Sequence, residues 1–95
     1  MKYKLKIEKK ALKKLKKMDK NRSALLISWI NKNLVDTDDP RKHGKALSGD
    51  YRGLWRYRVG DYRIVAMIKD DEILISIIDS GHRKDVYKWS MPLYQ

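Results

Sequence analysis

Side chains in the middle of the chain alternate between polar and apolar over residues 54–59 and again over residues 62–65, which predicts two strands. The Gly-Asp dipeptide between them tolerates the positive φ of a two-residue hairpin turn. With that turn, Arg58 faces Arg63 and Arg56 lies one diagonal away, so the three arginines share one face. The opposite face is apolar and fixes the register; it holds Trp55, Tyr57, Val59, Tyr62 and Ile64.

The pattern before this hairpin changes from strand to helix. Residues 1–7 alternate apolar side chains with lysines, which predicts a half-buried strand at an edge of the sheet. Apolar residues then recur at helical spacing over 8–19 and 22–34, so we expect a helical hairpin, followed by a polar loop over 41–50. Lysines cover the polar side of the first helix: Lys9, Lys10, Lys13, Lys14, Lys16 and Lys17.

A second strand pair, 64–69 and 72–79, flanks an Asp-Asp turn that is expected to place Arg63 opposite Ile78. The aliphatic face of this pair is the surface that the helices should cover. These patterns predict one α+β domain over residues 1–95 with two layers. In it, the N-terminal strand and the helical hairpin pack on one face of a mainly antiparallel sheet, and the arginine face remains uncovered.

Charge narrows the possible partners. The formal net charge of +11 at pH 7 favours an anionic partner such as nucleic acid, an anionic membrane or an acidic protein. The chain has no cysteine, which excludes disulfides, thiolate zinc sites and thiol nucleophiles. His43 and His82 lie too far apart in the sequence to form a metal motif, so we expect neither a metal nor another cofactor.

Hydropathy gives an expectation for location. No apolar run approaches the roughly 20 residues of a membrane span, and the basic first residues lack the apolar region of a secretory signal. We expect a cytoplasmic protein without a membrane partner.

The arginine face is the candidate site. Like charges directly opposite each other on two strands cost roughly 0.2–1 kcal/mol, so an anion is the missing partner. One metal-independent reaction suits these residues: the ribose 2′-hydroxyl of RNA attacks its own phosphodiester, and the protein stabilises charge and transfers protons. Arg56 and Arg63 are expected to hold the scissile phosphate, while Tyr87 or His82 serves as base or acid. The cations assigned to RNA binding are Lys13, Lys17, Lys45 and Arg58.

Each candidate also has a purely structural interpretation. The arginines can form an ordinary solvated strand face, because long charged side chains spread apart in water. Tyr87 can be a core tyrosine at a strand end, and His82, which follows a glycine, can be a turn residue.

Three segments of the chain together resemble one family. Residues 44–49 (GKALSG), 53–64 (GLWRYRVGDYRI) and 81–87 (GHRKDVY) look like the successive motifs of RelE-type toxins in the RelE/ParE toxin–antitoxin superfamily. The resemblance implies a small bacterial or archaeal toxin that a cognate RelB-like, partly acidic antitoxin neutralises. It also implies that the free toxin enters the ribosomal A site and cuts messenger RNA during translation.

The resemblance extends to single positions. Arg56 matches a catalytic lysine of the family prototype, and Arg63 matches its phosphate-stabilising arginine. Arg83 matches the arginine after the last strand, and Tyr87 matches the catalytic tyrosine. Leu54 departs from the pattern, because the prototype has a further lysine there that is implicated in proton transfer. This chain must either manage without that lysine or use Lys45, Arg58 or His82 in its place.

Two other functions stay open at this point. ParE-type toxins have the same fold but poison DNA gyrase by binding and are not nucleases. A plain basic nucleic-acid-binding module would also fit the lysine-rich helix, with an affinity that comes from phosphate contacts and falls steeply with salt.

Overall fold

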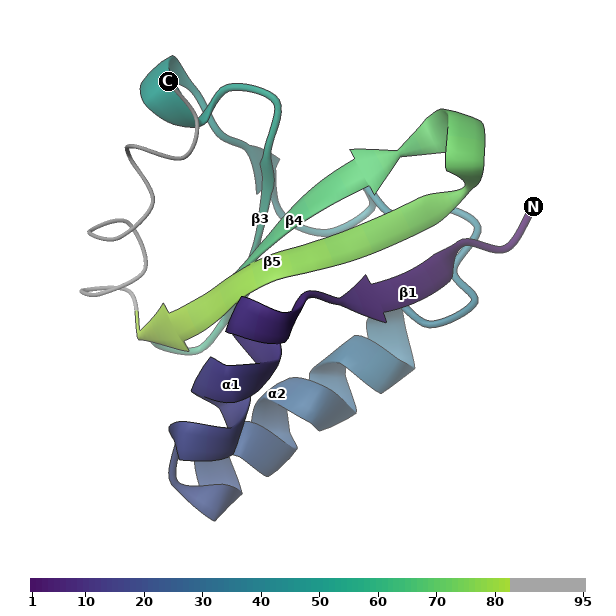
Figure 1. Cartoon of the computed structure of the whole chain (residues 1–95). Coiled ribbons are helices and arrows are strands. Elements are labelled where there is room, and N and C mark those ends of the chain that lie inside the picture. The colour runs from purple at the N-terminus through teal and green to yellow at the C-terminus, as the bar shows by residue number, and fades with distance from the viewer. Residues whose placement is uncertain (83–95) are drawn as a thin grey trace.

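The computed structural model describes residues 1–82 as a five-stranded sheet with two helices on one face (Figure 1). The strand order is β1-β5-β4-β3-β2; β1 runs parallel to β5, and every other neighbouring pair is antiparallel. The predicted two-layer α+β fold is therefore confirmed, with β1 at an edge. The elements are β1 (Lys4–Ile7), α1 (Lys9–Lys17), α2 (Lys20–Asn33), β2 (Lys45–Ala46), β3 (Trp55–Val59), β4 (Tyr62–Lys69) and β5 (Leu74–His82), with 3₁₀ turns at Gly49–Tyr51 and Asp70–Glu72.

The β3–β4 hairpin has the predicted register. Val59 pairs with Tyr62 and Arg58 pairs with Arg63 across the turn. Gly60 has a φ of 60°, as the first position of a type II′ turn requires, and this turn matches the twist of the flanking strands. The short strand β2 extends the sheet from β3, in a segment that was expected to be a loop.

The predicted register of β4 with β5 is wrong, because Gly81 lies opposite Arg63 where Ile78 was expected. Two features that the Asp-Asp dipeptide does not indicate cause the shift. The connection is a 3₁₀ turn that ends at Ile73 in a left-handed conformation (φ 51°), so it is longer than two residues. The register also shifts between Val65 and Ala66, which places an additional residue of β5 in a β-bulge.

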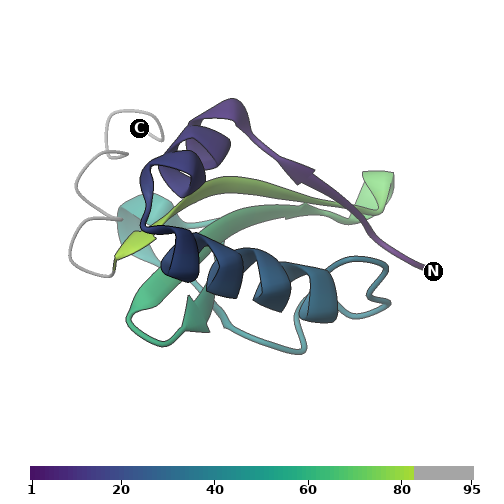
Figure 2. The ribbon, with the colours of Figure 1, turned by 90° about the horizontal axis from the view of Figure 1, so that it is seen from below.

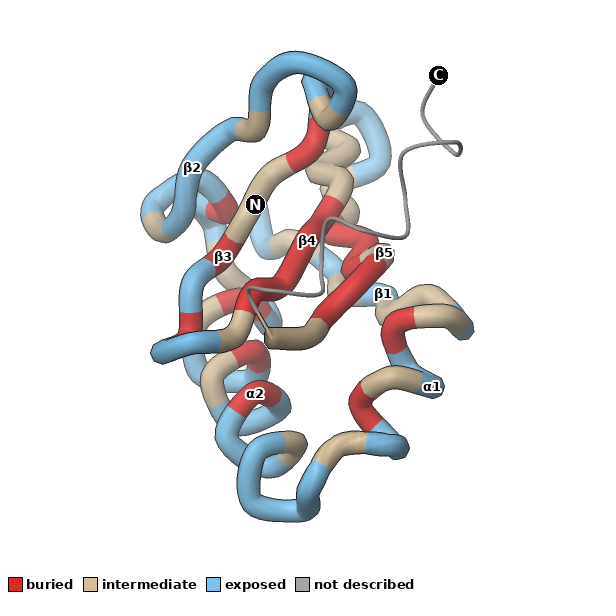
Figure 3. Tube along the Cα trace, turned by 90° about the vertical axis from the view of Figure 1, so that its left-hand side faces the viewer, coloured by how far each residue is buried: buried red, intermediate tan, exposed pale blue. Residues whose placement is uncertain are grey.

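The main core lies between the helices and the sheet. Figure 2 shows both helices in front of the sheet, and Figure 3 shows buried positions concentrated along β4, β5 and the inner sides of the helices. The helices bury only part of their apolar surface, since Leu12 stays 38% exposed and Ile27 41%. The buried residues of this core are Ala11, Leu15, Leu26, Ile30, Leu34, Tyr57, Val59, Ile64, Ala66, Ile75 and Ile77.

The second face of the sheet is not fully uncovered, contrary to the prediction. Leu54 and Val65 are buried there, with Leu47 and Tyr51 packed against them. The segment between β2 and β3 therefore covers part of this face and leaves the arginine side chains beside a small apolar cluster.

The loop before β2 is fixed to β3 by two hydrogen bonds. The buried Tyr57 hydroxyl donates to the Pro40 carbonyl at 2.6 Å, and Trp55 Nε1 donates to the His43 carbonyl at 2.7 Å. Gly44 follows with a φ of 85°, so close to β3 that a Cβ atom there would collide with the carbonyl oxygen of Arg56. A glycine is thus required where this loop enters β2.

An ion pair joins α1 to the far end of β5. Lys14 Nζ lies 2.9 Å from a carboxylate oxygen of Asp79, which is fully buried. Burial raises the pKa of the Asp79 carboxyl above its ordinary value, and Lys14 offsets part of that increase.

We predict that Gly44→Ala destabilises the fold more than Gly53→Ala. Both glycines have positive φ, so both substitutions carry backbone strain of about 1–2 kcal/mol. Only Gly44 also meets the β3 backbone, whereas a Cβ at Gly53 has nothing within 4 Å. Urea unfolding should show an additional loss of about 1–3 kcal/mol for Gly44→Ala. Equal losses in the two variants would contradict the close approach.

We also predict a pH dependence that comes from Asp79. Because its pKa is raised in the folded state, the stability it contributes is greatest below the ordinary aspartate pKa, about 4. That contribution is lost as the pH rises through the raised pKa. Urea unfolding across this range should show wild type losing stability relative to Asp79→Asn as the pH increases. A relative gain would mean that Lys14 more than compensates for burial.

Candidate functional site

Three neighbouring strands bring four of the sequence-predicted cations together. Arg63 of β4 lies directly opposite Arg58 of β3, and Arg56 is two residues before Arg58 on the same face. Lys45 of β2 lies opposite Arg56, so its side chain joins that face as well. The arginine face (Arg56, Arg58 and Arg63) and Lys45 therefore lie on the same side of the sheet, across β2, β3 and β4.

Arg63 is the most enclosed of these cations. It is only 7% exposed, and its Nη1 donates to the carbonyl oxygens of Gly60 and Tyr62, each at 3.2 Å. These bonds hold the guanidinium against the hairpin turn, so its position is defined before any ligand arrives. A fixed guanidinium binds a phosphate with less loss of side-chain entropy than a mobile one.

Arg56 carries an unsatisfied donor. Its Nε is buried and has no hydrogen-bond partner within residues 1–82. Leaving a buried donor unpaired costs about 1–3 kcal/mol, and more for a charged group. An anion on this face would therefore meet one guanidinium that is already positioned and a second that lacks an acceptor.

Ion pairs within the described chain lie elsewhere. Those found among residues 1–82 do not involve Lys45, Arg56 or Arg58. Their positive charges consequently remain available to attract an anion. The ion pairs are Lys6–Glu8, Lys14–Asp79 and Arg41–Asp70.

The apolar cluster beside the arginines changes what one family position can do. Leu54 is only 4% exposed and packs against Val65, with Tyr51 alongside. A buried leucine transfers no proton, so this position takes no part in acid–base chemistry. Lys45 is the lysine that lies opposite Arg56, on the neighbouring strand β2.

His82 is not brought to the arginine face. It lies opposite Tyr62 in the register, and the two rings form an edge-to-face contact with centroids 5.6 Å apart. Tyr62 packs against the main core, on the helix side of the sheet. The register therefore argues against the acid or base role predicted for His82, because a phosphate on the arginine face lies on the other side of the sheet.

The remaining predicted residues lie elsewhere. Lys13 and Lys17 are exposed on α1, in the helix layer, and so belong to a different surface from the arginines. Arg83 and Tyr87 lie outside the described residues, and their assignment stays a prediction.

The described residues also bear on metal and membrane sites. Among residues 1–82, no three histidine, cysteine, aspartate or glutamate side chains gather in a way that could hold a metal ion. No helix in the same range has the length and apolar character needed to cross a membrane.

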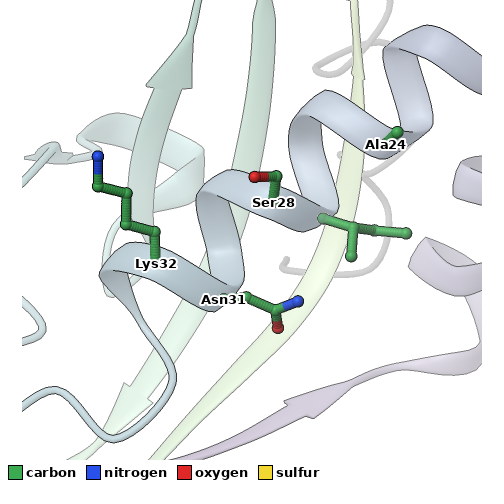
Figure 4. Close-up of a pocket in the computed structure, with 5 residues that line it drawn as sticks. Ala24, Ser28, Asn31 and Lys32 are labelled. Carbon is green, nitrogen blue, oxygen red and sulfur yellow. The ribbon is translucent and has the colours of Figure 1, made fainter.

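A shallow pocket on α2 is separate from these cations. Ala24, Ser28, Asn31 and Lys32 all project from this one helix (Figure 4), and Ile27 completes the lining. The pocket presents small and neutral side chains with a single lysine, which is a surface suited to contact with another protein rather than to chemistry.

Comparison with solved structures shows the same fold. A chain of the RelBE2 toxin–antitoxin complex from Mycobacterium tuberculosis matches with a TM-score of 0.78 and 25% identity, covering 90% of this chain and 95% of that one. The archaeal RelE–RelB complex from Pyrococcus horikoshii gives 0.66 and 26%, covering 90% and 99%. The isolated RelE toxin of E. coli gives 0.69 and 20%, covering 96% and 95%.

Comparison with sequences identifies the family. No match is found among curated proteins. The family model described as the ParE toxin of the type II toxin–antitoxin system parDE matches residues 5–87, which include both helices, the sheet except Lys4, and every cation of the arginine face. The chain belongs to this ParE toxin family of the RelE/ParE superfamily, and it is the toxin of a type II toxin–antitoxin system.

Proposed function

We propose that this toxin is a ribosome-dependent endoribonuclease that cuts messenger RNA in the ribosomal A site and so inhibits translation. The observation that carries the proposal is that two arginines share one face of the sheet: Arg63, which is enclosed, and Arg56, whose Nε has no acceptor. An RNA phosphate supplies the acceptor oxygens that this arrangement lacks. The ribosome and the message as partners follow from the resemblance to RelE-type toxins, and they place the activity in the cytoplasm.

The reaction needs no cofactor in this scheme. The ribose 2′-oxygen forms a bond to phosphorus as the bond to the 5′-oxygen breaks, which gives a 2′,3′-cyclic phosphate and a 5′-hydroxyl. The proton lost by the 2′-oxygen passes to a base, and an acid protonates the leaving 5′-oxygen. Arg56 and Arg63 oppose the charge that grows on the non-bridging oxygens.

The proton carriers are assigned by elimination and resemblance. Leu54 has no group that transfers a proton, and His82 packs edge to face on Tyr62 on the helix side of the sheet, away from the proposed phosphate site. Tyr87 is then the proposed base or acid, with Arg83 adding positive charge, as in the family motif. Lys45 and Arg58 bind the neighbouring phosphates, since both lie beside the reacting pair in the sheet.

A second function has its own support. The matching family model is named for ParE, and ParE-type toxins inhibit DNA gyrase by binding. The same cationic face would then contact an anionic surface of gyrase or its DNA and cut nothing.

An antitoxin is the second proposed partner. The similar structures from M. tuberculosis and P. horikoshii are toxin–antitoxin and RelE–RelB complexes. This chain offers two surfaces to such a partner: the cationic face, and the apolar residues exposed on the helices, Leu12, Leu25 and Ile27. A RelB-like antitoxin with an acidic segment matches the first surface by charge and the second by hydrophobic contact.

We predict that Arg63→Ala abolishes both mRNA cleavage and growth inhibition. Loss of a positioned donor to the transition state should lower the cleavage rate by at least about 100-fold. The measurement is primer extension on a defined mRNA in a translating bacterial extract. Lys32→Ala is the matched control, because it removes the same charge from exposed α2 and should cut normally.

Two results would contradict the proposed nuclease activity. Cleavage by Arg63→Ala at the wild-type rate, with folding verified by circular dichroism, would remove the arginine face from the reaction. Intact mRNA with wild-type toxin, together with cleaved DNA that accumulates on purified gyrase, would establish the ParE-like function instead.

We predict that antitoxin binding weakens as salt concentration rises. The toxin carries a net charge of +11, so steering and rim contacts with an acidic partner are screened at high ionic strength. Association kinetics of the cognate antitoxin at low and high salt should show a slower on-rate at high salt, by about tenfold or more. An unchanged on-rate would show that apolar contacts on the helices dominate recognition.

A further inference from the structure

A second cationic surface lies on the helix side of the sheet, away from the arginine face. Two adjoining pockets form a groove along α1, and they share Lys14 and Lys17. The first runs along the helix, and the second ends against the last residues of β5. We call this the lysine groove; it is lined by Lys9, Lys10, Lys13, Lys14 and Lys17, and at its end by Met18, Tyr62, Ser80, Gly81 and His82.

The end of the groove contains an unused donor. Ser80 is fully buried and its hydroxyl has no hydrogen-bond partner within residues 1–82. Leaving a buried hydroxyl unpaired is destabilising, so a position selected for stability alone would favour alanine. Ser80 lines the end pocket together with Lys14 and Lys17, and an oxygen-rich ligand bound there would offer its hydroxyl an acceptor.

The lysine groove remains positively charged despite the buried carboxylate of Asp79. Asp79 is buried and pairs with Lys14 at 2.9 Å, which neutralises that lysine. Lys13 and Lys17 are exposed on the same helix and keep the groove positive. The ion pair also holds α1 against β5, so the two walls of the groove are fixed relative to each other.

The end pocket has an aromatic wall as well as cations. The rings of Tyr62 and His82 meet edge to face with centroids 5.6 Å apart, and the guanidinium carbon of Arg22 in α2 lies 6.0 Å from the centre of the Tyr62 ring. Proteins that bind single-stranded nucleic acid commonly combine cations that contact phosphates with aromatic rings that contact bases. An acidic peptide would engage the lysines but has no need of the rings.

We propose that the lysine groove is a second RNA-binding site, in which Lys17 contacts a phosphate, Ser80 donates to a phosphate or ribose oxygen, and a base lies against Tyr62 and His82. This proposal has one element in common with the proposed function, since RNA is the ligand in both. Because the groove and the arginine face lie on opposite sides of the sheet, the toxin can hold one RNA segment in the groove while another is cut.

The test uses the full chain and a short single-stranded 2′-O-methyl RNA, which cannot be cleaved. The chain has two histidines, so their imidazole NMR signals report separately on the groove (His82) and on the loop before β2 (His43). RNA should shift the His82 signal, and Lys17→Gln should reduce that shift while leaving any shift of His43 unchanged. Fluorescence anisotropy over a range of salt then gives the affinity and the number of phosphate contacts.

Matched variants separate the groove from diffuse attraction. Lys17→Gln should weaken binding several-fold and reduce the salt slope by about 0.7, the value for one contact to single-stranded nucleic acid. Lys16→Gln removes the same charge from the neighbouring exposed position, which does not line the groove, and should have a smaller effect. Ser80→Ala should weaken binding while leaving the free energy of unfolding unchanged or increased, a combination that a structural hydroxyl would not give.

Three outcomes would overturn the proposal. RNA binding without a shift of His82 would place the RNA elsewhere. Equal losses of RNA affinity in Lys16→Gln and Lys17→Gln, with no loss in Ser80→Ala, would show general electrostatic attraction rather than a defined binding site. A shift of His82 with an oligoglutamate peptide but not with RNA would make the groove a protein-binding surface. Since no cleavage is measured, each result is independent of whether the arginine face cuts mRNA.

Discussion

The pairing of β3 with β4 determines where the charges of this toxin lie. Because side chains alternate along a strand, a slip of one residue would exchange the arginines with the buried Tyr57 and Ile64. The burial of those two residues beneath the helices therefore fixes the arginine face, and Gly60 permits the tight turn that brings Arg58 opposite Arg63. The core and the candidate site thus follow from one register.

That register lowers the stability of the fold at positions where an anionic ligand would offset the loss. Two arginines oppose each other directly, and Arg56 keeps a buried donor without a described acceptor. Each feature lowers stability by an amount that an apolar or neutral substitution would restore. The fold tolerates them because apolar clusters on both faces of the sheet hold the strands together. Conflicts of this kind between local stability and side-chain choice are expected at functional sites.

The parts of the fold that the sequence predicts well are the local ones. The hairpin turn, the helices and the edge strand depend on neighbouring residues, so alternation and helical spacing reveal them. The β4–β5 register fails because it depends on Ile73 in a left-handed conformation and on a bulge near Val65, neither of which an Asp-Asp dipeptide indicates. β5 also extends beyond its predicted end at residue 79 to His82, which pairs with Tyr62 on the helix side of the sheet and not beside the arginines.

Other features of the sites depend on contacts between distant segments. Lys45 joins the arginines through a two-residue strand that polar composition had hidden, and Asp79 meets Lys14 from the opposite end of the chain. The only sequence signal for the second pair is an acidic residue that ends a run of isoleucines. A single charge in such a run is a reason to look for a buried partner.

Whether such a face cuts RNA or only binds an anion depends on proton transfer. Arg56, Arg58, Arg63 and Lys45 are cations at neutral pH, so they bind a phosphate and stabilise its growing charge but do not readily accept a proton. Electrostatic stabilisation and proton transfer are separate contributions to the rate, and a face that has only the first remains a binding surface. Leu54 stands where the family motif has a proton carrier, and His82 lies opposite Tyr62 on the helix side of the sheet. Under the proposed mechanism the nuclease activity would depend on Tyr87, and a toxin with this same arginine face but without that tyrosine would be expected to act by binding.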